Sequence, residues 1–181
     1  HEAIAKIADF CRARKDVCFH TATLPQAAIL HGAESFYARN VPLYQYQPGT
    51  DPIEGALHML TELHVSTDVL TEDAGRAFLG EYPLSVLPEQ SFVDEELRKR
   101  LRAYVEGGGH LFLSGTDAAG LWPDLVGARP RGGLVEKGVF LEVGGEAVGL
   151  AGAWQPVEPA AETEVLAYRL NQQEPSRNLT D

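Results

Sequence analysis

The chain has 181 residues, enough for one α/β domain with a sizeable hydrophobic core. Its net charge of −11 argues against nucleic acids and anionic membranes as partners, because both are bound by basic surfaces. No apolar run approaches the roughly 20 residues of a membrane-spanning helix. No signal peptide is recognisable either, so the sequence predicts a cytoplasmic protein.

The first segment is predicted to be a helix over residues 2–14, whose apolar positions repeat at helical spacing: Ile4, Ile7, Ala8 and Cys11. We interpret residues 1–24 as this helix plus a connector, and the helix could equally offer its apolar face to a preceding domain. Cys11 and Cys18 stand seven residues apart, about 10 Å along a helix, which is beyond disulfide reach. They show no zinc spacing, so we expect two half-buried structural residues.

From residue 25 onward, strand and helix patterns alternate. Strands are predicted over residues 25–31, 66–70, 82–87 and 110–113. Helices are predicted from Pro52 to about Leu63 with Asp51 as the cap, and over residues 72–79, 94–106 and 118–126. The segments between the first strand and Pro52 are predicted to be irregular, with a loop or short turn over residues 32–37 and an extended loop over residues 40–50.

Residues 81–117 carry the clearest indication of the fold. A short apolar strand is followed by an amphipathic helix, which ends at three glycines before a second apolar strand begins. This order predicts a βαβ unit with parallel strands and a right-handed connection. Ligands of such sheets bind beyond the carboxyl ends of the strands, so any chemistry of this chain should lie next to Glu89 and after Leu113.

The C-terminal third predicts antiparallel strands. Residues 139–143 and 147–150 flank Gly144 and Gly145, a hairpin signal, and residues 163–170 form a last strand after a loop at 129–133. The sequence therefore predicts a flavodoxin-like, three-layer open α/β sheet over residues 25–170, mostly parallel, with a C-terminal antiparallel extension. Residues 171–181 are read as a polar tail. A start without methionine and this tail suggest a domain excised from a longer polypeptide.

Two tracts carry a family resemblance. Residues 26–37 (QAAILHGAESFY) resemble the first strand and turn of the β-galactosidase trimerisation domain, which follows the catalytic barrel in glycoside hydrolase family 42. Residues 82–115 resemble the strand, proline, helix, double-glycine and strand of the same domain, so the resemblance covers roughly residues 25–127. It implies a fold similar to class I glutamine amidotransferases. It also implies the other domains of a parent chain as partners, and a homo-oligomer as a further option.

The amidotransferase triad is incomplete in this chain. The matching nucleophile turn, residues 113–117, has no cysteine, and both cysteines precede the first strand. The last histidine is His110, so no later histidine can act as the base. We therefore predict no catalytic residue and no cofactor. Glu54, His58 and Glu62 are spaced i, i+4, i+8 on one face of a predicted helix, which we interpret as a solvated face and not as a metal site.

Other chemistry would require residues at the carboxyl edge of the sheet. We name a candidate pocket of residues that follow predicted strands: His31, Glu34, Glu89, Ser114, Thr116 and Asp117. A nucleophilic Ser114 needs a base within hydrogen-bond reach, but His110 lies four residues earlier on the same strand, about 13 Å away. Glycosidase-type carboxylates would have to stand roughly 5–10 Å apart. Acids and serines at strand ends are more often caps and turn residues.

Two functions from different classes follow. The leading hypothesis is a non-catalytic module of a larger glycoside hydrolase that serves subunit assembly or forms a wall of a neighbouring active site. Its candidate interface is a set of aromatic residues, since aromatics concentrate in interfaces: Phe36, Tyr37, Tyr44 and Tyr46. The alternative is a small-molecule hydrolase or sugar-binding domain that uses the carboxyl edge of the sheet.

Overall fold

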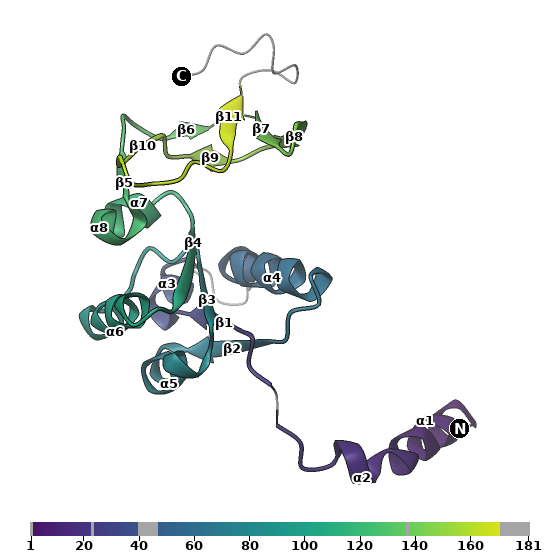
Figure 1. Cartoon of the computed structure of the whole chain (residues 1–181). Helices are drawn as coiled ribbons and strands as arrows, with labels where there is room; N and C mark the ends of the chain where they lie inside the picture. Colours follow the sequence, from purple (N-terminus) through teal and green to yellow (C-terminus); the bar gives the residue numbers. More distant parts are fainter. Residues whose placement is uncertain (1, 23, 40–46, 137, 171–181) are drawn as a thin grey trace.

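The computed structural model describes residues 2–22, 24–39, 47–136 and 138–170. At its centre is a parallel sheet of four strands in the order β2-β1-β3-β4 (Figure 1). The strands are β1 (Ala27–His31), β2 (Thr67–Thr71), β3 (Leu84–Pro88) and β4 (His110–Ser114). This is the strand order of a flavodoxin-like sheet, so the predicted parallel arrangement is confirmed.

Helices cover both faces of the sheet and give three layers. α5 (Glu72–Phe78) and α6 (Glu95–Glu106) lie on one face, and α4 (Gln47–Glu62) lies on the other (Figure 1). Alternate residues of β1 point to opposite faces. Leu30 is therefore buried with the core residues of α6, and Ile29 is buried with those of α4. Each face of the central strands is thus fully desolvated.

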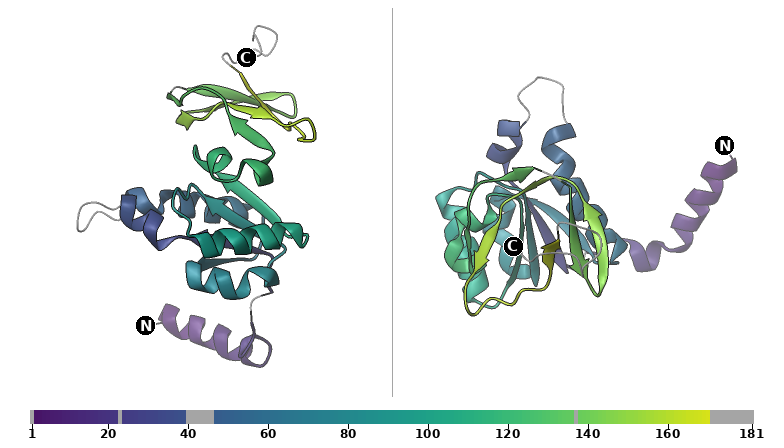
Figure 2. Two further views of the ribbon diagram at one scale, coloured as in Figure 1. Left: turned by 90° about the vertical axis from the view of Figure 1, so that its left-hand side faces the viewer. Right: turned by 90° about the horizontal axis from the view of Figure 1, so that it is seen from above.

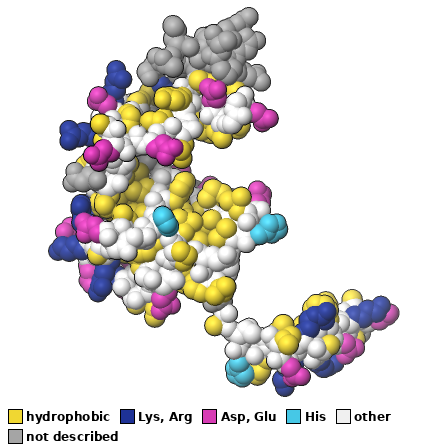
Figure 3. Space-filling model, in the orientation of Figure 1, with side chains coloured by type: hydrophobic (Ala, Val, Ile, Leu, Met, Phe, Trp, Pro, Cys, Tyr) yellow, Lys and Arg dark blue, Asp and Glu magenta, His cyan; other side chains and the backbone are white. Residues whose placement is uncertain are grey.

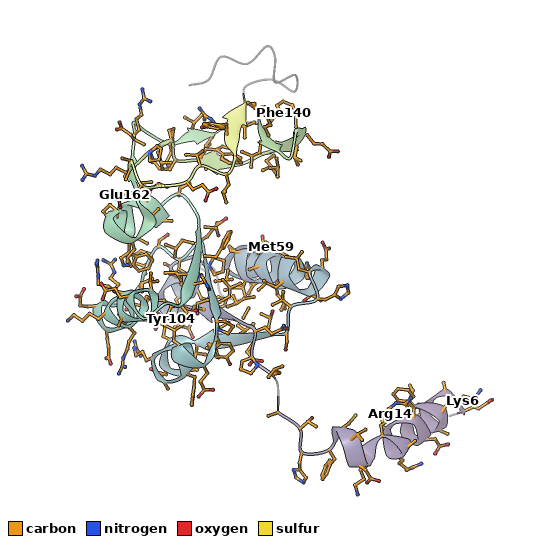
Figure 4. All side chains as sticks on the ribbon, viewed as in Figure 1. Lys6, Arg14, Met59, Tyr104, Phe140 and Glu162 are labelled. Carbon is orange, nitrogen blue, oxygen red and sulfur yellow. The ribbon has the colours of Figure 1, made fainter. Side chains whose placement is uncertain are left out.

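α6 has the boundaries that its sequence predicts. The Asp94 side chain caps the helix by accepting the Leu97 N–H at 2.8 Å. At the other end the Tyr104 hydroxyl lies 2.9 Å from the Tyr82 carbonyl oxygen, and Tyr104 stands across the sheet from Met59 (Figure 4). A Cβ on Gly109 would clash with the Tyr104 ring, so this close approach favours glycine where the helix turns into β4.

The carboxylate that caps α6 makes the free energy of unfolding depend on pH in the acid range. The pKa of the Asp94 carboxyl is lowered, chiefly by the Leu97 N–H and further by Arg76, with which it forms an ion pair. Because the folded-state pKa is depressed, this stabilisation is present at neutral pH and is lost as the pH falls through that pKa. We expect Asp94→Asn, which keeps an acceptor for the cap, to be less stable than wild type at pH ~7 and to differ from it by a smaller margin at pH ~3. Urea unfolding at both pH values measures this, and a deficit that persists undiminished in acid would contradict it.

The C-terminal part forms a separate antiparallel layer beyond the carboxyl edge of the sheet (Figure 2). Two short helices lead into it, α7 (Ala118–Leu121) and α8 (Pro123–Val126). Its paired strands are β5 (Ala128–Pro130) with β10 (Val157–Pro159), β6 (Val135–Glu136) with β9 (Ala153–Trp154), and β7 (Val139–Val143) with both β8 (Glu146–Leu150) and β11 (Tyr168–Leu170). The hairpin at Gly144 and Gly145 is confirmed, since both have positive φ. We call this layer the extension.

Several predicted elements need correction. The loop expected over residues 32–37 is a helix, α3 (Ala33–Arg39), which begins where the Phe36 N–H bonds to the Gly32 carbonyl oxygen. α4 begins at Gln47, so Asp51 does not cap it and Pro52 lies inside it. Pro52 lacks the N–H that would bond to the carbonyl oxygen four residues earlier, yet the helix continues through it, which the cap signal could not reveal. The rest of the expected loop, including Tyr44 and Tyr46, lies outside the described residues.

Three further boundaries differ. The single helix predicted over residues 118–126 is divided at Trp122, because the residue before a proline disfavours helical geometry. The loop predicted at 129–133 includes part of β5, and the strand predicted over 163–170 is regular only at its last three residues. A short 3₁₀ turn, η1 (Leu79–Glu81), joins α5 to β3.

The N-terminal segment stands apart from the sheet (Figures 1 and 2). It comprises α1 (Glu2–Ala13), as predicted, and α2 (Lys15–Cys18), and neither helix has a buried residue. Both cysteines are exposed, which corrects the expectation of half-buried residues. None of the described helices is long and apolar enough to span a membrane.

Candidate functional site

The carboxyl edge of the sheet carries two hollows. The larger, about 580 Å³, lies between α4 and the two strands β3 and β4. We call it the α4–β4 groove, and its lining includes Asp51, Ala56, Met59, Val86, Glu89 and Phe112. Figure 3 shows hydrophobic atoms gathered in this region, below the overhanging extension. One side of the groove is helix, its floor is strand, and no described element closes it beyond β4.

The smaller hollow, about 130 Å³, is polar. It lies where β3 and β4 end, and its lining includes Glu89, Gln90, Ser91, Ser114, Thr116 and Asp117. Four of the six predicted pocket residues therefore meet here, because they follow neighbouring parallel strands. Glu89 and Ser114 line both hollows, so the two adjoin at these residues.

His31 and Glu34 line neither hollow. The His31 ring lies 5.3 Å from the Phe36 ring, which also contacts Tyr37 at 5.5 Å between centroids. Glu34 is exposed on α3. It contributes to the raised pKa of the Glu72 carboxyl, of which burial is the largest cause. The helical course of residues 33–39, which the sequence reading missed, carries Glu34 away from the ends of β3 and β4, whereas His31 is the last residue of β1.

The topological switch point between β1 and β3, where flavodoxin-like sheets bind ligands, is occupied by a side chain of the protein. The Gln90 Oε1 accepts the Gly32 N–H at 3.0 Å, and its Nε2 donates to the Pro88 carbonyl oxygen at 3.0 Å. Gln90 is 8% exposed. A second link between the same two loops lies nearby: Ser35 Oγ accepts the Phe92 N–H and donates to the Phe92 carbonyl oxygen, each at 3.0 Å.

We expect Gln90→Ala to lower the free energy of unfolding by about 1–3 kcal/mol, because it leaves the buried Gly32 N–H without its acceptor. Equilibrium urea unfolding measures the loss. Ser91→Ala, which removes a hydroxyl from the next position, serves as the control and is expected to change stability by less than about 0.5 kcal/mol. Equal stabilities of Gln90→Ala and wild type would show that the Gln90 amide does not hold the switch point closed.

The backbone at the meeting point of the hollows is unusual. Glu89 has a φ of +47°, rare for a residue with a side chain, and its N–H donates to the Ser114 carbonyl oxygen at 3.0 Å. Gly115 has a φ of +105°, and a Cβ there would lie 2.9 Å from the Glu89 Cα. Neither the role of Gln90 nor the conformation of Glu89 has a signal in the sequence, because both depend on how two loops meet. Gly115, by contrast, is recognisable in the sequence as a turn position, because it is a glycine between the polar residues Ser114 and Thr116.

Ser114 has no general base on its own strand. Ser114 and His110 stand at opposite ends of β4, about 13 Å apart, so His110 cannot take the serine proton. Within residues 2–22, 24–39, 47–136 and 138–170, no three His, Cys, Asp or Glu side chains come together as a metal site would require. The arrangement can offer hydrogen-bond acceptors and an apolar floor to a neighbour or ligand.

Comparison with known proteins identifies the fold through solved structures. No family model and no curated protein matches the sequence. A GH42 β-galactosidase from G. stearothermophilus matches 93% of the chain with a TM-score of 0.70 at 19% identity. A β-galactosidase from Rahnella sp. R3 (93%, 0.68, 19%) and an α-L-fucosidase isoenzyme 2 from Paenibacillus thiaminolyticus (90%, 0.68, 18%) also match. The chain spans only 27%, 28% and 26% of these structures, respectively.

Proposed function

We propose that this chain is a non-catalytic α/β module of a larger glycoside hydrolase, where it supports subunit assembly or forms a wall of a neighbouring active site. The observation that carries the proposal is the coverage. Glycosidase structures match 90–93% of this chain, including its extension, yet the match fills only 26–28% of each. Residues 25–170 would be the module, residues 1–24 the connector, and residues 171–181 a tail.

The site supports a non-catalytic role. Gln90 fills the position where a ligand of a flavodoxin-like sheet binds, and Ser114 has no histidine within reach on its strand. We extend the proposal to an amidotransferase-like fold that lacks the catalytic triad. Tyr37, 72% exposed beside Phe36, would contact another part of the parent enzyme.

Enzyme assays test the non-catalytic role directly. The chain is incubated with nitrophenyl β-galactoside, nitrophenyl α-fucoside and nitrophenyl acetate, with Ser114→Ala and Glu89→Gln as matched variants. We expect hydrolysis at the same background rate for all three proteins. Hydrolysis above background that either substitution abolishes would overturn the proposal, because it would place catalysis in this domain.

A sugar-binding role is the second candidate, and the α4–β4 groove favours it. The groove volume of about 580 Å³ lies in the range of small-molecule sites, and half-exposed Phe112 lies beside Glu89 and Ser114. Calorimetric titration with galactose and lactose tests it. A saturable heat that Phe112→Ala removes would favour the sugar-binding role, whereas no heat at millimolar sugar would favour the module.

A further inference from the structure

The parallel sheet ends at β4, whose outer side is uncovered. β4 is the outermost strand in the order β2-β1-β3-β4, and among the described residues no strand pairs with its outer side. The His110 N–H donates to the Pro83 carbonyl oxygen at 3.1 Å, on the side of β3. Successive residues of a strand direct their backbone groups to opposite sides, so those of Leu111 and Leu113 point to the outer edge. These groups have the spacing that a further parallel strand requires.

The α4 face of β4 is uncovered as well. Val86 of β3 is 1% exposed beneath α4, whereas Phe112, its partner in register on β4, is 48% exposed. On the other face, Leu111 and Leu113 pack against the core cluster of α6. Neighbouring helices pack roughly 8–10 Å apart, about two strand spacings, so a helix beside α4 would lie over β4 and the position beyond it. The α4–β4 groove therefore has the place and the width of one more helix.

The chain already contains the connection that a further strand needs. A right-handed step from β4 to a strand beyond it requires a helix on the face of α6, as the step from β3 to β4 does. α7 and α8 lie on that face, since Trp122 is buried in the α6 cluster and Leu121, Leu125 and Val126 pack against this cluster. The extension follows α8 directly. It therefore stands between these two helices and the strand to which they would lead.

The charges around the groove indicate which helix would fit it. The charged side chains in its lining, Asp51 and Glu89, are both acidic, and α4 contains no Lys or Arg residue. A helix with an apolar stripe and with Lys or Arg beside that stripe would complement both the floor and the wall of the groove. Residues 171–181 contain one large apolar residue, Leu179, so their sequence has neither a strand pattern nor a helix pattern of this kind.

We propose that the polypeptide continues beyond the extension into a fifth parallel strand beside β4 and a basic, amphipathic helix that fills the α4–β4 groove. The strand pairs with the outer backbone groups of Leu111 and Leu113, and the helix covers Phe112 and Met59. The extension is then an insertion in the last crossover of the sheet. This inference rests on the proposed function, because it takes the chain as part of a larger polypeptide. Its test measures the coverage of a surface, so it can fail while the non-catalytic role stands.

The gene gives the first test. The 181-residue chain is compared with a longer chain that includes the next residues encoded in its gene, roughly 50 of them, enough for one strand, one helix and their connections. We expect these residues to contain an apolar run of about five positions, followed by an apolar stripe at helical spacing with Lys or Arg beside it. A reading frame that stops at Asp181, or that continues without this order, would overturn the inference.

Thiol labelling then measures whether the groove is covered. In a Cys11→Ser, Cys18→Ser background, which replaces two exposed residues, Phe112→Cys is reacted with a maleimide in both chains. We expect the introduced thiol to react at least about tenfold more slowly in the longer chain, because the helix excludes the reagent. Val148→Cys, at an equally exposed position of β8, is the matched control and should react at one rate in both. Met59→Cys, on the α4 wall, repeats the measurement with the Phe112 ring in place.

Hydrogen exchange detects the fifth strand separately from the helix. The amides of Leu111 and Leu113 should exchange at least about 100-fold more slowly in the longer chain, whereas the Phe112 amide, which points towards β3, should change less. Equal thiol and amide rates in the two chains would contradict the inference. So would slow labelling of Phe112→Cys in the shorter chain that depends on protein concentration, because a second copy would then be the occupant of the groove.

Discussion

Replacing Gly115 with alanine is expected to lower the free energy of unfolding by about 2–4 kcal/mol. Two costs combine at this position. The φ of +105° is one that a residue with a Cβ rarely adopts, and the new Cβ would lie 2.9 Å from the Glu89 Cα. The neighbour is backbone and cannot rotate aside as a side chain could. Relaxation would have to shift Glu89, whose own φ is +47°.

Chemical denaturation of Gly115→Ala measures the effect. Gly55→Ala is a matched control, since Gly55 lies in α4 with open space around it, and the change should stabilise the chain by up to about 1 kcal/mol. If Gly115→Ala unfolded at the wild-type denaturant concentration, the tight contact between the ends of β3 and β4 would be refuted. The two hollows would then be free to change shape.

Replacing Trp122 with alanine is expected to cost about 3–5 kcal/mol, as for other buried large-to-small changes. Trp122 is 4% exposed and belongs to the core cluster on the α6 face. The Arg98 guanidinium lies 5.9 Å from the centre of its ring. Because Trp122 separates α7 from α8, it anchors the segment that leads to the extension.

Fluorescence can follow both parts of the molecule in this variant. Trp154 of β9 becomes the remaining tryptophan, so its emission reports on the extension while circular dichroism reports on the helices. We expect the extension to unfold at a lower urea concentration than the helices in Trp122→Ala. Trp122→Phe, which keeps most of the packing, should lose less than half as much stability. Coincident, wild-type-like transitions in Trp122→Ala would mean that the extension does not depend on this anchor.

The central sheet was predictable because buried parallel strands are continuous apolar runs. Residues 27–30 are such a run, residues 84–87 are one apart from Ser85, and the glycines after α6 mark the end of that helix. The N-terminus of α4 was not predictable. Asp51 followed by Pro52 is a strong start signal, and only the tertiary structure shows the helix beginning earlier. Local signals identify an element well but place its ends poorly.

Part of the candidate site was likewise predictable from the sequence, and part was not. Glu89, Ser114 and Asp117 lie together because the topology places the ends of β3 and β4 side by side, which follows from the βαβ pattern alone. Gln90 escaped prediction because its role depends on a side chain crossing to Gly32, 58 residues earlier in the chain. Long-range contacts made by one flexible side chain leave no periodic trace in a sequence.

The two edges of the sheet differ in how they are protected against misassembly. β2 carries Asp68, held by the Tyr82 hydroxyl at 2.8 Å, whereas the sequence of β4, HLFLS, contains neither proline nor an Asp, Glu, Lys or Arg residue. Charges and prolines are the usual defences of exposed strands against indiscriminate pairing. β4 is thus the segment through which this chain is expected to aggregate when produced at high concentration. A lysine in place of Phe112 would be the first change to try for a soluble preparation.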